Sequence, residues 1–178
     1  MLQYMQEENL IKNEDVELYQ YGIHLMLLKL LHYCSILIIG LFLGRGIELF
    51  IFLFAYTIIR SYIGGYHAKK SRICLLISIA MIFFIHVTID IVPDIISLII
   101  VLISTVIICM FSPIQSQEKP MKINEIKRNQ VIARFMAITL FILFIVFYIT
   151  KFFFIYLPIG YSLLFSSFFL LLALKSEE

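Results

Sequence analysis

Long apolar runs separated by short polar segments dominate the chain. Six of these runs approach the roughly 20 mostly apolar residues that a helix needs to cross the hydrocarbon core of a bilayer. We place them at residues 22–43, 46–63, 74–90, 92–111, 133–150 and 152–173. The runs are continuous and do not alternate between apolar and polar residues, which argues against membrane-spanning strands. The pattern therefore predicts an all-α, polytopic integral membrane protein.

The first run is the least regular, because His24, Lys29 and His32 interrupt it. It follows an N-terminal segment, residues 1–20, in which apolar residues such as Leu2 and Met5 stand among acids. We expect this segment to form an amphipathic helix on the inner membrane surface. The pattern leaves open whether residues 22–43 span the bilayer fully or in part continue the interfacial helix.

Composition agrees with a membrane protein, and the placement of charge predicts its orientation. The chain is 62% hydrophobic and only 15% charged, whereas soluble domains are about half apolar and a quarter charged. With six spans and a cytoplasmic N-terminus, the outer loops hold only Arg45 and Lys151. The inner segments hold Lys12, Arg60, Lys69, Lys70, Arg72, Lys119, Lys122, Lys127, Arg128, Arg134 and Lys175. The positive-inside rule therefore places both termini and both long basic loops in the cytoplasm.

Residues 60–74, with the sequence RSYIGGYHAKKSRIC, hold a candidate nucleophile at their end. Ser71 is a suitable N-cap for the third span, which puts Cys74 in the first turn of that helix. The free amides and dipole of a helix start, together with nearby cations such as Lys69 and Lys70, lower the pKa of a thiol. Cys34 and Cys109 instead lie within apolar runs, so we interpret them as structural.

The candidate base in this segment is His67, seven residues before Cys74. On one straight helix this spacing corresponds to a rise of roughly 10 Å, whereas a nucleophile and its base must approach to about 3 Å. Gly64 and Gly65 give the backbone freedom just upstream, and a helix start at Ser71 permits a turn. We therefore predict a break between His67 and Cys74, with His67 folded back over the helix start.

The same residues have a simpler interpretation as a cytoplasmic topology anchor. Arg60, near the end of the second span, either reaches the headgroups or clamps a carboxylate or carbonyl of a substrate. We expect no metal site, because no third ligand stands near His67 and Cys74. The other polar stretch, residues 111–134, has five basic residues and two acids. It is either a positive-inside loop or a docking surface for an acidic peptide or anionic lipid.

One motif of the chain resembles a known family. The pattern Arg-x3-Gly-Gly-x-His-x6-Cys at the end of the second span is similar to that of the AgrB family, the membrane-embedded peptide-processing proteases of Gram-positive quorum sensing. It is formed by Arg60, Gly64, Gly65, His67 and Cys74. The segment from Pro113 to Lys119-Pro120 also resembles the second cytoplasmic loop of that family. The resemblance covers nearly the whole chain.

The resemblance implies one membrane-embedded peptidase domain over residues 1–178, with a catalytic inner loop at 60–74 and a second cytoplasmic loop at 112–133. Cys74 matches the nucleophile of the family and His67 its catalytic histidine. Such a cysteine endopeptidase removes the acidic tail of an AgrD-like precursor through a thioester, then closes a thiolactone autoinducer. The resemblance implies no cofactor and no nucleic-acid partner. The implied partners are the precursor, membrane lipid and a second copy of the chain, at the cytoplasmic face of the cell membrane.

Further residues are expected to bind the substrate or to support the site: Arg60, Gly64, Gly65, Lys69, Lys70, Lys119 and Lys122. The chain departs from many relatives at Pro113-Ile114-Gln115, where they carry an acid shortly after the proline. The third catalytic member is therefore open among Gln115, Gln117 and Glu118. For the oxyanion hole we expect backbone amides near Cys74.

Two other functions compete with a peptidase. A small peptide exporter predicts polar residues in mid-span or broken helices, and only Pro158-Ile159-Gly160 indicates such a break. A non-catalytic membrane scaffold predicts that His67 and Cys74 can be replaced freely. Cleavage of a precursor by the native chain, lost in variants of these two residues, distinguishes the peptidase from both.

Overall fold

The computed structural model describes residues 16–63, 71–113 and 123–177. These residues form six α-helices and contain no strand. The helices are α2 (Val16–Phe42), α3 (Gly46–Ile63), α4 (Ser71–Thr88), α5 (Asp94–Phe111), α6 (Ile123–Ile149) and α7 (Phe153–Glu177). The predicted all-α class is thus confirmed for the described part of the chain.

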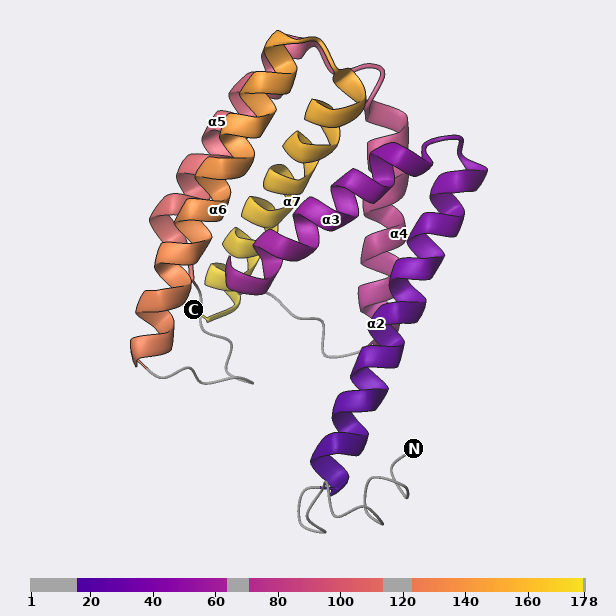
Figure 1. Ribbon diagram of the computed structural model, residues 1–178, viewed down its shortest axis with the longest axis vertical. Coiled ribbons are helices and arrows are strands. Elements are labelled where there is room, and N and C mark those ends of the chain that lie inside the picture. The colour runs from indigo at the N-terminus through magenta and orange to yellow at the C-terminus, as the bar shows by residue number, and fades with distance from the viewer. Residues whose placement is uncertain (1–15, 64–70, 114–122, 178) are drawn as a thin grey trace.

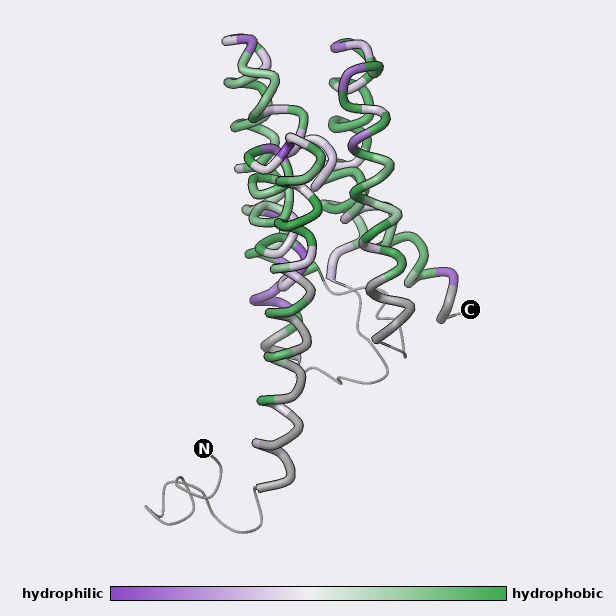
Figure 2. The backbone as a smooth tube through the Cα atoms, turned by 90° about the vertical axis from the view of Figure 1, so that its right-hand side faces the viewer, coloured by the Kyte–Doolittle hydropathy of each residue, from purple (hydrophilic) through white to green (hydrophobic). Residues whose placement is uncertain are grey.

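Four helices are long and apolar enough to cross a membrane, so the chain is a multi-pass membrane protein. These spans are Gly46–Ile63, Asp94–Phe111, Ile126–Ile149 and Phe153–Lys175. In α2 and α4 the described side chains give shorter apolar stretches, Tyr33–Phe42 and Leu76–Thr88. Figure 2 shows hydrophobic residues along most of the helices and hydrophilic ones mainly near their ends. A count of six spans, and cytoplasmic termini, stay predictions.

The helix α7 lies at the centre of the bundle. It packs against α3, α5 and α6, while α2 packs against α3 and α4 (Figure 1). Two-thirds of the α7 span (67%) is buried, compared with 17% of the α6 span. Gly160 permits this close packing, because a Cβ at that position would lie 3.0 Å from Val101 and 3.1 Å from Phe144. The core of the protein is therefore built around α7.

The break that Pro158-Ile159-Gly160 suggested is not present, since α7 is one continuous helix through Pro158. Pro158 lies five residues after the start of α7 and is fully buried. Neighbouring helices hold such a proline in place, and this is why membrane helices tolerate a residue that breaks isolated ones. The structure of α7 therefore lacks the helix break that would have favoured an exporter.

Several helices begin earlier than the apolar runs that predicted them. The helix α6 begins at Ile123, ten residues before the predicted span, so the second half of the predicted loop 112–133 is helical. The helix α2 begins at Val16 and includes the end of the predicted N-terminal helix, whose residues 1–15 lie outside the described part. Hydropathy marks the apolar part of a helix, whereas the helix itself continues into polar flanking residues.

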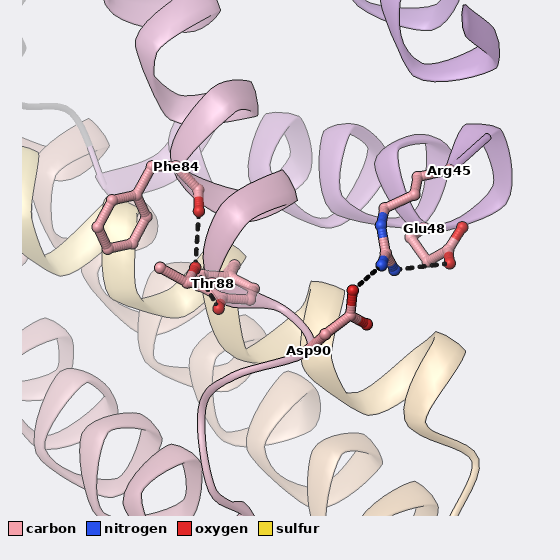
Figure 3. Close-up of polar contacts among 6 residues, drawn as sticks. Arg45, Glu48, Phe84, Thr88 and Asp90 are labelled. Atoms are coloured by element: carbon pink, nitrogen blue, oxygen red, sulfur yellow. Dashed lines mark hydrogen bonds and ion pairs between the residues drawn. The ribbon is translucent and has the colours of Figure 1, made fainter. Parts of the chain in front are cut away.

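Polar contacts tie the turns together at the end of the bundle that is predicted to face outward. Arg45, in the turn between α2 and α3, pairs with Asp90 after α4 and with Glu48 at 3.5 Å (Figure 3). Lys151, between α6 and α7, pairs with Asp94 at 2.8 Å, and this contact raises the pKa of Lys151 above its ordinary value. The two clusters join turns that are far apart in sequence.

Candidate active site

The two helix ends that flank the candidate site lie at the same end of the bundle. The helix α3 ends at Ile63 and α4 begins at Ser71, both in the lower half of Figure 1 together with the end of α5 and the start of α6. The helix α4, as described, contains Cys74 as its fourth residue and does not contain His67. The two long polar segments that the sequence singled out thus both begin and end at this side of the molecule.

Most of the other candidate residues lie outside the described part of the chain, and so does the predicted fold-back of His67. This holds for His67, Gly64, Gly65, Lys69, Lys70, Lys119, Lys122, Gln115, Gln117 and Glu118. Their roles therefore stay predictions. What the structure adds comes from the helices on either side.

The position of Cys74 follows from where α4 begins. The helix starts at Ser71, three residues before Cys74. The first four backbone amides of a helix have no partner within it, and they carry the positive end of the helix dipole. An anion in this first turn is therefore stabilised. This is the environment that favours a thiolate over a thiol.

Arg60 lies in the last turn of α3 and contacts α7. Its guanidinium carbon stands 5.6 Å from the ring centroid of Phe169, a cation–π distance. The side chain is partly buried, so Arg60 holds the end of α3 against the central helix as well as carrying charge there. Sequence reasoning missed Phe169, because nothing local links residues 109 positions apart.

Residues in the outer half of α4 anchor this helix to the bundle. Ile82 and Ile85 are buried, and the Thr88 hydroxyl lies 2.7 Å from the hydroxyl of Tyr161 on α7. Leu76, two residues after Cys74, is 66% exposed. These anchoring contacts lie up to fourteen residues, or roughly 21 Å along the helix, from Cys74.

Cys34 and Cys109 are free thiols on α2 and α5. Neither lies in the first turn of its helix. Their placement within apolar helices agrees with the structural role expected from sequence.

A cavity of about 70 Å³ lies between α4, α5, α6 and α7. Its lining includes Phe84, Val101, Phe144 and Tyr161, and is apolar. Phe84 stands ten residues after Cys74, roughly 15 Å along α4. The cavity is therefore separate from the candidate active site.

Comparison with known proteins agrees with the motif in residues 60–74. The family described as Accessory gene regulator B (AgrB) matches residues 1–173. Two AgrB-like proteins of Clostridium perfringens, from strain SM101 and from strain 13, are each 31% identical to the chain over 127 residues. Each match covers 66% of this chain and 59% of the relative's length. No solved structure matches the chain. With both polar segments inside the matched region, the chain belongs to the accessory gene regulator B family.

Proposed function

We propose that the chain is a membrane cysteine endopeptidase that removes the acidic C-terminal tail of an AgrD-like precursor and cyclises the remaining peptide to a thiolactone. Membership of the AgrB family indicates a role in accessory gene regulator quorum sensing. The observation that supports the finer proposal is the place of Cys74 in the first turn of α4, at the end of the bundle where α3 and α5 end and α6 begins.

The first step is attack of the Cys74 thiolate on the carbonyl before the tail. His67 takes the thiol proton as general base. The carbon–sulfur bond forms, the carbon–nitrogen bond breaks, and His67 returns the proton to the leaving amine. The tail departs with a free amino terminus, and the rest of the peptide stays on Cys74 as a thioester.

The second step transfers the acyl group to a cysteine thiol of the bound peptide. His67 takes the proton of this thiol, the resulting thiolate attacks the thioester carbonyl, a new carbon–sulfur bond closes the ring, and Cys74 leaves as a thiolate. One thioester replaces another, so the exchange is nearly balanced in energy. Water competes for the same carbonyl, and partial exclusion of water at the membrane boundary favours ring closure over hydrolysis.

The charge near the site suits an acidic tail. Lys69 and Lys70 precede α4, and Lys119 and Lys122 precede α6. Arg60 adds a cation that Phe169 holds at the end of α3. Fixed positive charge raises the local concentration of an acidic peptide. We assign these residues to substrate binding and positioning.

The test is co-expression of the chain with an AgrD-like precursor, with the released tail measured by mass. Cys74→Ala should release no tail, because the nucleophile is gone. His67→Ala should slow release by about 10²- to 10⁴-fold, the usual contribution of a general base. In the wild type, the precursor should also be found on Cys74 as a thioester that hydroxylamine cleaves.

Cys34→Ser and Cys109→Ser are matched controls, since they make a similar change in thiols within apolar helices. Both should release the tail at nearly the wild-type rate. Tail release by both Cys74→Ala and His67→Ala would make the chain a non-catalytic scaffold for cleavage by another protein. Loss of release in folded Cys34→Ser and Cys109→Ser would contradict the structural role expected for these two thiols.

A further inference from the structure

The end of α5 has a backbone acceptor that its own helix cannot satisfy. The amide of Ser112 donates to the carbonyl of Ile108, which continues the helical pattern by one residue. The next bond in that pattern would join the amide of residue 113 to the carbonyl of Cys109. Residue 113 is a proline and has no N–H to donate. The Cys109 carbonyl must therefore find its donor elsewhere.

Arg134 on α6 supplies that donor. Its Nε donates to the Cys109 carbonyl at 3.0 Å, so the arginine takes the place of the missing amide of Pro113. A guanidinium has five N–H donors, and this bond uses one of them. The four donors on Nη1 and Nη2 remain. Because Nε is fixed by the end of α5, the outer edge of the guanidinium is fixed as well.

No acid neutralises this cation among the residues that the structure describes. The described ion pairs involve Arg45 and Lys151, which belong to the turns at the opposite end of the bundle. Arg134 itself is exposed. A fixed guanidinium with free, paired donors binds a phosphate or carboxylate group in a bidentate manner.

The surroundings of Arg134 decide between anions. Val131 and Phe135 beside it on α6, and Met110 on α5, are exposed apolar residues. In a membrane-spanning helix such side chains contact lipid acyl chains. An anion at this site must therefore be attached to an apolar body, which describes a phospholipid better than a soluble acidic peptide.

The depth of Arg134 fits a headgroup. From Arg134 to Ile149 at the other end of α6 is fifteen residues, a rise of roughly 23 Å, against a hydrocarbon core of roughly 30 Å. Helical side chains point toward the N-terminus of their helix, so Arg134 extends from this depth toward the nearer membrane surface. Its guanidinium thus extends toward the lipid headgroups on the side of the candidate active site.

We propose that Arg134, held by the Cys109 carbonyl, forms a binding site for the phosphate of an anionic phospholipid at the junction of α5 and α6. The lipid phosphate accepts hydrogen bonds from Nη1 and Nη2, and its acyl chains lie along Val131 and Phe135. The site couples a lipid headgroup to the end of α5, directly before the second polar segment. It is independent of the peptidase chemistry, because it uses neither Cys74 nor His67.

The test is a titration of the purified full chain in detergent with phosphatidylglycerol, with bound lipids counted by native mass spectrometry. Arg134→Met should weaken lipid binding by about 10- to 100-fold, the loss expected for hydrogen bonds to a charged group. Lys127→Met is the matched control. It removes the same charge from an exposed position of α6 and should bind as the wild type does.

Further arms identify the ligand. Diacylglycerol, which has acyl chains and no phosphate, should not distinguish wild type from Arg134→Met, and inorganic phosphate should not displace phosphatidylglycerol. Displacement by phosphate or by a soluble acidic peptide would overturn a lipid site, as would equal losses in Lys127→Met and Arg134→Met. If Arg134→Met does not fold, Arg134→Lys decides. Lysine keeps the positive charge but lacks the paired N–H donors of the guanidinium, so lipid binding equal to that of the wild type would refute the proposed geometry.

Discussion

The buried acid of the outer ion cluster leads to a prediction about stability. Arg45 lies between two carboxylates of very different exposure: the Glu48 side chain is 7% exposed and the Asp90 side chain 68% (Figure 3). Arg45→Met removes the cation that compensates the buried carboxylate of Glu48. Removing one partner of a buried pair typically costs 3–5 kcal/mol. The Arg45 side chain is 18% exposed, so we expect a loss near the lower limit, about 3 kcal/mol.

Changing the exposed partner should have a much smaller effect. Asp90→Asn leaves the pair of Arg45 and Glu48 intact and removes an exposed charge, for which about 0.5–1 kcal/mol is expected. Adding Glu48→Gln to Arg45→Met removes the uncompensated charge. We expect the double variant to recover about 2 kcal/mol relative to Arg45→Met alone, because a neutral amide is much less costly to bury than a charge.

The assay is reversible unfolding of the chain in mixed detergent micelles, followed by circular dichroism. A double-mutant cycle over Arg45 and Glu48 isolates their coupling. Two results would refute the reasoning. One is that Asp90→Asn destabilises the chain as much as Arg45→Met does. The other is that Glu48→Gln recovers nothing in the Arg45→Met background, since the buried carboxylate then contributes no penalty.

Two further predictions concern α7 and use the same unfolding assay. Gly160→Ala should lower the free energy of unfolding by about 1–3 kcal/mol, because its methyl group enters a filled space. Gly22→Ala is the control: a Cβ there has nothing within 4 Å, so the change should be neutral or raise the free energy of unfolding by up to about 1 kcal/mol. Equal effects would show that packing around α7 tolerates the methyl group. The Thr88 hydroxyl donates to the Phe84 carbonyl, so Tyr161 is the donor in the Thr88–Tyr161 bond. Thr88→Val should therefore cost about 1–3 kcal/mol by leaving a buried donor unpaired, and Tyr161→Phe only about 0.5–1.5 kcal/mol; the reverse order would contradict this direction.

Hydropathy predicted every outer helix end to within two residues, whereas it misplaced the inner ends of α2, α4, α6 and α7 by three to ten residues. The predicted run 46–63 coincides with α3, and 92–111 differs from α5 by two residues. At the other end of the bundle, α6 begins ten residues before its apolar run. The outer turns are short, so the end of an apolar run is also the end of a helix there. The first residues of α6, before its apolar run, are largely polar but include good helix formers, such as Glu125 and Lys127, which a hydropathy pattern does not register.

Contacts between distant residues could not be predicted from one sequence. Arg45 was predicted to lie in an outer loop, but its pairing with Asp90 depends on how the α2–α3 turn meets the end of α4. The contact of Arg60 with Phe169 depends in the same way on α3 packing against α7. The start of α4 was predictable because its signal is local: Ser71 was expected to begin the helix that contains Cys74, and α4 does begin at Ser71. The pairing of Cys74 with His67 depends on the path of residues 64–70 and stays a prediction.

Charge is distributed differently at the two ends of the bundle. In the turns around Arg45 and Lys151, each described cation is paired with an acid. On α6, Lys127, Arg128 and Arg134 are exposed, and the described residues provide no acidic partner for them. An ion pair lowers the field that each charge exerts on solvent, whereas a cation without an acid continues to attract anions within about 10 Å at ordinary salt. The outer turns therefore contribute to stability, whereas the cations on α6, at the end that holds Cys74, are not neutralised by any acid that the structure describes.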